Sequence, residues 1–227
     1  MADAETAYQK GLEAKPTVAA DRVKATSTVP EERLGVLQSN PWISGCRELS
    51  WDPDRCLTFL LHSSVVQAQV AAVRTATSYV QRAPTGSWLL GELRKRPELM
   101  VGSHFFDSIS NYPWPGEVTP DENGHAKLMS SVASSVVLYH VSVFVQNRRP
   151  ECIANTLFHE LLHVWFLATY SGYNETLGTG HDPGAGVTIW PGCKKSYKGF
   201  HDEFRKKLES FDVDLSQKVP GAAKCCS

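Results

Sequence analysis

Apolar and polar positions alternate most regularly between residues 134 and 145. The alternate residues that would share one face of a strand are Val137, Tyr139, Val141, Val143 and Val145. Because successive side chains of a strand point to opposite faces of a sheet, this pattern predicts a β-strand over 134–145. The same alternation places His140 on the opposite face of that strand.

Apolar residues recur at helical spacing in the stretch that precedes this strand. Over 57–80 they return every three or four positions, which predicts a helix that ends near Pro84. A second helix is expected over 87–96, because Pro97 lacks the backbone N–H that would continue it. The N-terminal part of the chain is therefore expected to be helical.

Two further helices are expected after the strand. Pro150 suits a first helical position, and the apolar pattern that follows predicts a helix to about Tyr170. The last helix is expected over 200–211. A short strand over 99–109 and a turn at 121–124 complete the pattern. These elements together predict an α+β fold.

Composition divides the chain into three parts. Residues 1–40 are poor in large apolar side chains and are expected to form a mobile arm. A single domain is expected over 41–215, with a flexible tail over 216–227. Residues 172–199 contain seven of the sixteen glycines and show no periodicity, which indicates a long functional loop. We expect N-terminal helices, a small twisted mixed sheet, a helix packed beneath it and a C-terminal helix.

The helix expected after Pro150 carries His159, Glu160 and His163. Residues four apart lie on one face of a helix, so both imidazoles can reach one ion. Glu160 lies about 100° further round the helix, where its carboxylate can take a proton from a zinc-bound water. Because the rest of this helix is apolar nearly all round, burial requires a partner for these polar groups, and a metal ion provides one. We expect His159 and His163 to bind Zn2+ and Glu160 to be catalytic.

A catalytic zinc site takes three protein ligands and a water, so a third ligand is expected after this helix. His201 is preferred, because a ligand at the start of a helix is held more rigidly than one on a loop. His181, in a glycine-rich segment, is the alternative third ligand, and Glu203 and Asp182 are weaker candidates. The histidine that does not bind zinc is expected to donate hydrogen bonds near the ion.

The other histidines are expected to have structural or exposed roles. His62, His104 and His125 are isolated in the sequence. His140 is expected in the core or at the surface, and contact with substrate is its alternative role.

Net charge and cysteine content exclude several other classes of protein. A formal charge of −1 predicts no general attraction to nucleic acid or to anionic membranes. Six cysteines occur without a CxxC pair, so a zinc site made of cysteines alone is not expected. Cys46 and Cys56 are expected either to pair across an intervening turn or to remain free thiols. The chain shows no signal-peptide pattern and no apolar run long enough to span a bilayer. It is therefore expected in the cytoplasm, or exported without a signal peptide.

In these residues the chain resembles the zincin metalloproteases. The resemblance is carried by His159, Glu160 and His163, by the strand before them and by a histidine after them. The chain is also loosely similar to SprT-like proteases, whose third histidine lies in a His-Gly-Pro-Glu-Phe-like sequence, one residue longer than 201–204 here. NleD-like effector metalloproteases have a Thr-Gly-Arg-x-Leu-Leu helix that looks like residues 85–90.

This resemblance implies a zincin-like fold and a zinc-dependent metallopeptidase with Glu160 as general base. It also implies that the strand before the metal helix pairs with the substrate backbone. We expect a monomeric enzyme that hydrolyses a protein or peptide substrate. The alternative is a non-catalytic binding or effector protein that zinc stabilises, which would not need Glu160. A third interpretation, a helical interaction module with an accidental motif, predicts no metal.

Overall fold

The computed structural model describes residues 46–52, 57–96, 99–114, 118, 123–131, 137–171, 188–190, 194–196 and 201–219. For 46–52, 127–131, 137–138, 170–171, 188–190 and 194–196 it describes the backbone alone. The arm expected at 1–40, most of the loop expected at 172–199, and Cys56 lie outside these residues.

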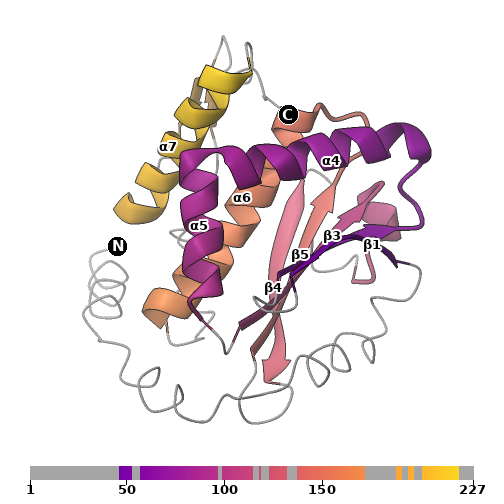
Figure 1. The fold of residues 1–227 in the computed structure, drawn as a ribbon, viewed down its shortest axis with the longest axis horizontal. Coiled ribbons are helices and arrows are strands. Elements are labelled where there is room, and N and C mark those ends of the chain that lie inside the picture. Colours follow the sequence, from indigo (N-terminus) through magenta and orange to yellow (C-terminus); the bar gives the residue numbers. More distant parts are fainter. Residues whose placement is uncertain are drawn as a thin grey trace.

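A five-stranded mixed sheet forms one layer of the described structure, and helices form the other (Figure 1). Its strands run in the spatial order β1-β2-β3-β5-β4. The pairs β1/β2 and β4/β5 are antiparallel, whereas β2/β3 and β3/β5 are parallel. The strands are β1 (Cys46–Asp52), β2 (Leu57–His62), β3 (Leu99–Phe106), β4 (Gly124–Ser131) and β5 (Val137–Phe144). An α+β fold with a small mixed sheet is therefore confirmed.

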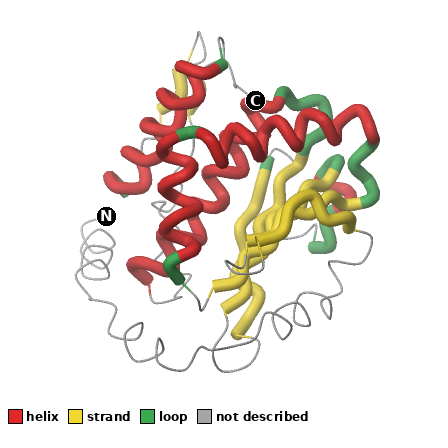
Figure 2. Tube along the Cα trace, viewed as in Figure 1, coloured by secondary structure: helices red, strands yellow, loops and turns green. Residues whose placement is uncertain are grey.

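The helices of the described chain gather on one side of this sheet (Figure 2). They are α4 (Gln67–Arg82), α5 (Pro84–Arg94), α6 (Pro150–Phe166) and α7 (Asp202–Lys218), and α6 continues as a π-helical segment, Leu167–Ser171. A short 3-10 helix, η3 (Ile109–Asn111), follows β3, and two short strands, β6 (Thr188–Trp190) and β7 (Lys194–Ser196), pair antiparallel. The main core lies between the helices and the sheet.

The helix expected over 57–80 is wrong over its first ten residues. Residues Leu57–His62 form strand β2, and the helix begins at Gln67. Five of the six residues of β2 are buried, so the strand is covered on both faces. A short apolar run of this kind fits a buried strand and a buried helix equally well, and periodicity alone does not separate them. Consequently the described chain begins with a β-hairpin, not with helices.

The strand expected over 134–145 is confirmed as β5, but its place in the sheet differs from expectation. Both edges of β5 are already paired, one with β3 and the other with β4. Its backbone therefore cannot pair with a substrate. Strand β4, which the sequence pattern did not predict, is the terminal strand of the five-stranded order on this side. Its alternation is interrupted by a register shift between Leu128 and Ser130, which explains why the pattern was missed.

The connection from β5 to α6 is short. Asn147 adopts a positive φ of 57°, a conformation that asparagine tolerates better than most residues. Pro150 then occupies the first turn of α6, as the sequence predicted. Helix α6 packs against β4 and β5 on one side and against the other helices on its remaining sides, so twelve of its seventeen residues are buried. The expected helix beneath the sheet is confirmed.

Helix α7 is longer than the helix expected over 200–211. It runs to Lys218 and so extends past the expected domain boundary at 215. Its buried stripe recurs at helical spacing and consists of Phe204, Leu208, Phe211 and Leu215. Phe211 stacks on Phe158 of α6 with ring centroids 4.1 Å apart. This stripe anchors the start of α7, including His201, against α6.

Two glycines of α5 make a matched pair for a stability test. A Cβ added at Gly86 would lie 2.1 Å from the carbonyl oxygen of Val80, whereas one added at Gly91 would meet nothing within 4 Å. Gly91→Ala is expected to stabilise the protein by up to about 1 kcal/mol, since alanine loses less backbone entropy in a helix. Gly86→Ala is expected to destabilise it by about 1–3 kcal/mol, because α5 must move away from the end of α4. Urea denaturation of both variants measures the difference, and equal stabilities would contradict this packing.

Candidate metal centre

His159 and His163 lie together on one face of α6, half-buried, with ring centroids 4.7 Å apart. Two imidazoles on one tetrahedral zinc, with Zn–N distances of about 2.0–2.1 Å, would have ring centres about 5 Å apart. The spacing of the two rings therefore fits a shared ion. A pair one helical turn apart forms this arrangement from local structure alone.

Both histidine rings rest on Phe204 of α7. The centroid of Phe204 lies 4.8 Å from that of His163 and 5.6 Å from that of His159. Phe204 is fully buried and also contacts Phe166, at 5.7 Å. Because an aromatic wall restricts the rotamers that each imidazole can adopt, α7 helps to preorganise the pair.

Glu160 faces a different neighbour. Its side chain is buried, with 8% of its surface exposed, and its Cγ lies against the backbone of Gly124 at the start of β4. The histidines therefore face α7, and the adjacent carboxylate faces the terminal strand of the sheet. This separation follows from the rotation of about 100° per residue along a helix. Of the three motif residues, His159 and His163 thus lie against α7, and Glu160 lies against the start of β4.

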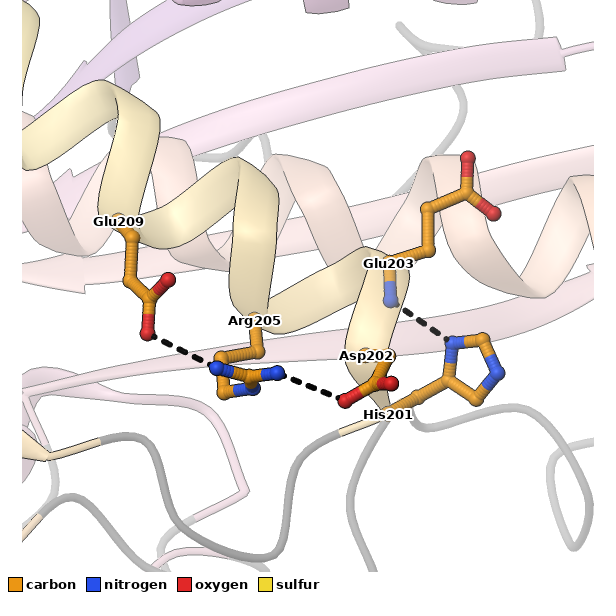
Figure 3. A network of polar contacts seen from close by, with 5 residues as sticks. All are labelled: His201, Asp202, Glu203, Arg205 and Glu209. Carbon is orange, nitrogen blue, oxygen red and sulfur yellow. Dashed lines mark hydrogen bonds and ion pairs between the residues drawn. The ribbon is translucent and has the colours of Figure 1, made fainter.

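His201 is placed at the N-terminus of α7, where it caps the helix (Figure 3). Its Nδ1 accepts a hydrogen bond from the backbone N–H of Glu203 at 3.3 Å. In a neutral imidazole an accepting Nδ1 leaves the proton on Nε2, so neither nitrogen of this arrangement has a lone pair for zinc. Its ring also contacts Phe166, at 5.3 Å between centroids. To bind the ion, His201 would have to give up the cap.

The remaining polar groups at the start of α7 face solvent. Arg205 pairs with Asp202 at 2.8 Å and with Glu209 at 3.4 Å (Figure 3). The hydrogen bond from Arg205 lowers the pKa of the Asp202 carboxyl. These are helix-spaced surface pairs, which contribute little to stability. Figure 3 shows Glu203 and His201 on the other side of the first turn, away from this row.

No third ligand joins His159 and His163 within the part of the chain that the structure describes. Among those residues, no group of three or more His, Cys, Asp and Glu side chains is arranged to hold a metal. His181 and Asp182 lie outside the described residues, so the choice between His201 and His181 stays a prediction.

The other four histidines lie on the opposite face of the sheet, away from α6. His104 is paired in register with Ser142, and His140 with Gly102, on the adjacent strands β3 and β5. The two imidazoles are almost fully buried, and their ring centroids are 4.2 Å apart. His62 and His125 occupy the neighbouring strands, and Tyr112 and Trp114 pack over His140. His140 is therefore in the core and not at the face of the sheet that α6 covers.

His104 is expected to make the stability of the protein depend on pH. Burial lowers its pKa to about 4, an effect opposed by a hydrogen bond with the Gly102 carbonyl and reinforced by His62. In the unfolded chain His104 takes up a proton with a pKa near 6.5, whereas in the folded chain it stays neutral until the pH approaches 4. The contribution of His104 to stability is therefore complete above pH 6.5 and is lost as the pH falls towards 4. The loss between pH 7 and pH 4 from this group is about 3 kcal/mol.

His104→Leu tests this loss, because leucine does not titrate. Urea denaturation from pH 7 to pH 4 is expected to show a shallower decline for the variant than for the wild-type protein. Parallel declines would show that His104 does not titrate differently in the folded and unfolded states.

Cys152, in the first turns of α6, takes part in a disulfide. The pairing expected between Cys46 and Cys56 concerns side chains outside those the structure describes. In the described part of the chain no helix has both the length and the apolar character needed to cross a membrane.

Comparison of the chain with protein-family models, with curated proteins and with solved structures finds no match.

Proposed function

We propose that this chain is a zinc-dependent metallopeptidase with a zincin-like architecture. One observation carries the proposal: two histidines with 4.7 Å between ring centroids lie beside a buried glutamate on a helix that packs under the terminal strand of a mixed sheet. A structural zinc site has no need of a buried carboxylate next to its ligands, whereas hydrolysis needs a base at that position.

Peptide hydrolysis in this proposal requires residues that bind zinc and a residue that transfers a proton. His159 and His163 hold zinc, with a third ligand from His201 or His181. Bound zinc supplies Lewis-acid polarisation of a water molecule and of the scissile carbonyl. Glu160 accepts the proton of the attacking water at its carboxylate and then donates it to the nitrogen of the leaving amine. Burial of Glu160 keeps bulk water away from this proton transfer.

The substrate backbone is proposed to pair with β4 and not with β5. The zincin resemblance implies that the strand before the metal helix binds the substrate, but that strand is β5, and both of its edges are occupied. Strand β4 begins over Glu160 and terminates the five-stranded order. An extended peptide that adds to a sheet edge gains main-chain hydrogen bonds and is held in a fixed register.

We predict one zinc ion per chain. The fit of the His159–His163 pair to a shared ion is the reason. Protein purified without chelator is analysed for metals by mass spectrometry, with a His159→Ala/His163→Ala variant as the control expected to lose the ion. A zinc content below about 0.2 equivalents in the wild-type protein, unchanged after zinc is supplied, would contradict the proposed function.

Digestion of a peptide library by the zinc-loaded protein then tests catalysis itself. Zinc binding without cleavage of any peptide would favour the zinc-stabilised binding protein.

A further inference from the structure

Gly124, the first residue of β4, leaves no room for a side chain. A Cβ at this position would lie 2.6 Å from Cγ2 of Thr156, 2.9 Å from Cγ of Glu160 and 2.9 Å from the carbonyl oxygen of Ser142. Atoms other than hydrogen do not approach a Cβ this closely, so any larger residue would displace β4, α6 or Glu160. The methylene of Glu160 therefore packs directly on the backbone of the strand.

A partly buried arginine, Arg148, links the same strand to the same helix. Nη1 of Arg148 donates to the carbonyl oxygens of Phe144 at 2.9 Å and Asn123 at 3.4 Å. Its Nη2 donates to the carbonyl oxygen of Cys152 at 3.0 Å and to Oγ1 of Thr156 at 2.7 Å. Burial lowers the pKa of Arg148 to about 10, so the guanidinium stays charged at neutral pH.

These contacts join three parts of the fold around Glu160. Asn123 immediately precedes Gly124, and Thr156 lies one helical turn before Glu160 on the same face of α6. Phe144 is the last residue of β5, the strand that lies between Asn123 and Thr156 in the sequence. The rigid, planar guanidinium reaches all three at once, which a lysine ammonium on a flexible stem cannot do.

We propose that Gly124 and Arg148 are positioning residues that set Glu160 in place for catalysis. The inference rests on the proposed function in that Glu160 is taken to be the general base. Arg148 fixes the distance between the start of β4 and α6, and Gly124 provides the space that Glu160 fills. Displacement of a catalytic group by about 1 Å can reduce turnover up to about 100-fold.

Gly124→Ala tests the inference, with Gly91→Ala as the matched control because its added methyl meets no atom within 4 Å. The Gly124 variant is expected to keep one zinc, since Glu160 is not a ligand. Its kcat on the best-cleaved library peptide is expected to fall by about 10- to 100-fold, with KM within about twofold of wild type. Gly91→Ala is expected to keep wild-type kcat.

A second measurement does not depend on activity. The side-chain carboxyl of Glu160, assigned by its absence in Glu160→Gln, is followed by 13C NMR in zinc-free protein. Its chemical shift is expected to change in Gly124→Ala and in Arg148→Lys but not in Gly91→Ala. Arg148→Lys adds no volume, so it tests the same inference if Gly124→Ala does not fold.

The two proposals fail in distinguishable ways. Wild-type kcat and an unchanged Glu160 shift in both Gly124→Ala and Arg148→Lys would overturn the positioning role. Inactivity of the wild-type protein, together with a changed Glu160 shift in the two variants, would overturn the peptidase and support the positioning of Glu160 by these residues.

Discussion

Glu160→Gln is expected to reduce peptide hydrolysis at least about 100-fold, the usual scale for removal of a general base. Glutamine has the size and shape of glutamate, so the contact of its Cγ with Gly124 is kept. It cannot accept the proton of the attacking water. Zinc content is expected to remain at one per chain, because the histidines and not Glu160 bind the ion. Single-turnover kinetics at saturating substrate measure the chemical step.

Glu151→Gln is the matched control for this variant. Glu151 lies on the same helix, is also buried and pairs with Arg149 at 3.1 Å, but it is in the first turn, far from the histidines. Its replacement is expected to leave kcat unchanged, with any effect limited to stability. Full activity in Glu160→Gln would show that Glu160 is not the general base and would contradict the mechanism as proposed.

Elements with a strong local signal were predicted from the sequence. Helix α6 has Pro150 at its start and apolar positions nearly all round, and β5 has an unbroken apolar row on one face. Strand β2 was mistaken for a helix because an apolar stretch of six residues carries too little periodicity to decide. What settles its conformation is its pairing with β1 and β3, which depends on residues far away in the sequence.

The motif residues of the site were predictable for the same reason. A spacing of four positions on a helix brings His159 and His163 together without any tertiary contact. Gly124 and Arg148 were not identified, because their role arises where β4 meets α6. The sequence did contain one signal: the turn at 121–124 ends in the glycine that the close approach requires.

The proximity of the histidines on the other sheet face could not be predicted from the sequence. His104 and His140 are 36 positions apart in the sequence, yet adjacent parallel strands bring their ring centroids to 4.2 Å. Strand alternation correctly separates His140 from the valine-rich face. The register between β3 and β5, which makes the two histidines neighbours, is set by packing across the whole sheet.

The last prediction concerns the third zinc ligand. We expect replacement of His201 to weaken zinc binding at least about 100-fold, and replacement of His181 to leave zinc bound and mainly slow turnover. His201 lies one turn before Phe204, the residue on which both metal-binding rings rest, and contacts Phe166 one turn after His163. The start of α7 is thus held beside the histidine face of α6, and His201 must leave the cap to bind the ion.

The cap complicates a simple alanine substitution, because its loss alone destabilises a helix by about 0.5–2 kcal/mol. His201→Asn avoids this, since asparagine caps helices at least as well as histidine but lacks the imidazole. We expect His201→Asn to keep the melting temperature of the zinc-free protein and to lose zinc to a chromogenic chelator that the wild-type protein resists. His181→Asn is the matched variant in the glycine-rich segment. If His181→Asn loses zinc and His201→Asn retains it, the third ligand is His181 and the role of His201 is to cap α7.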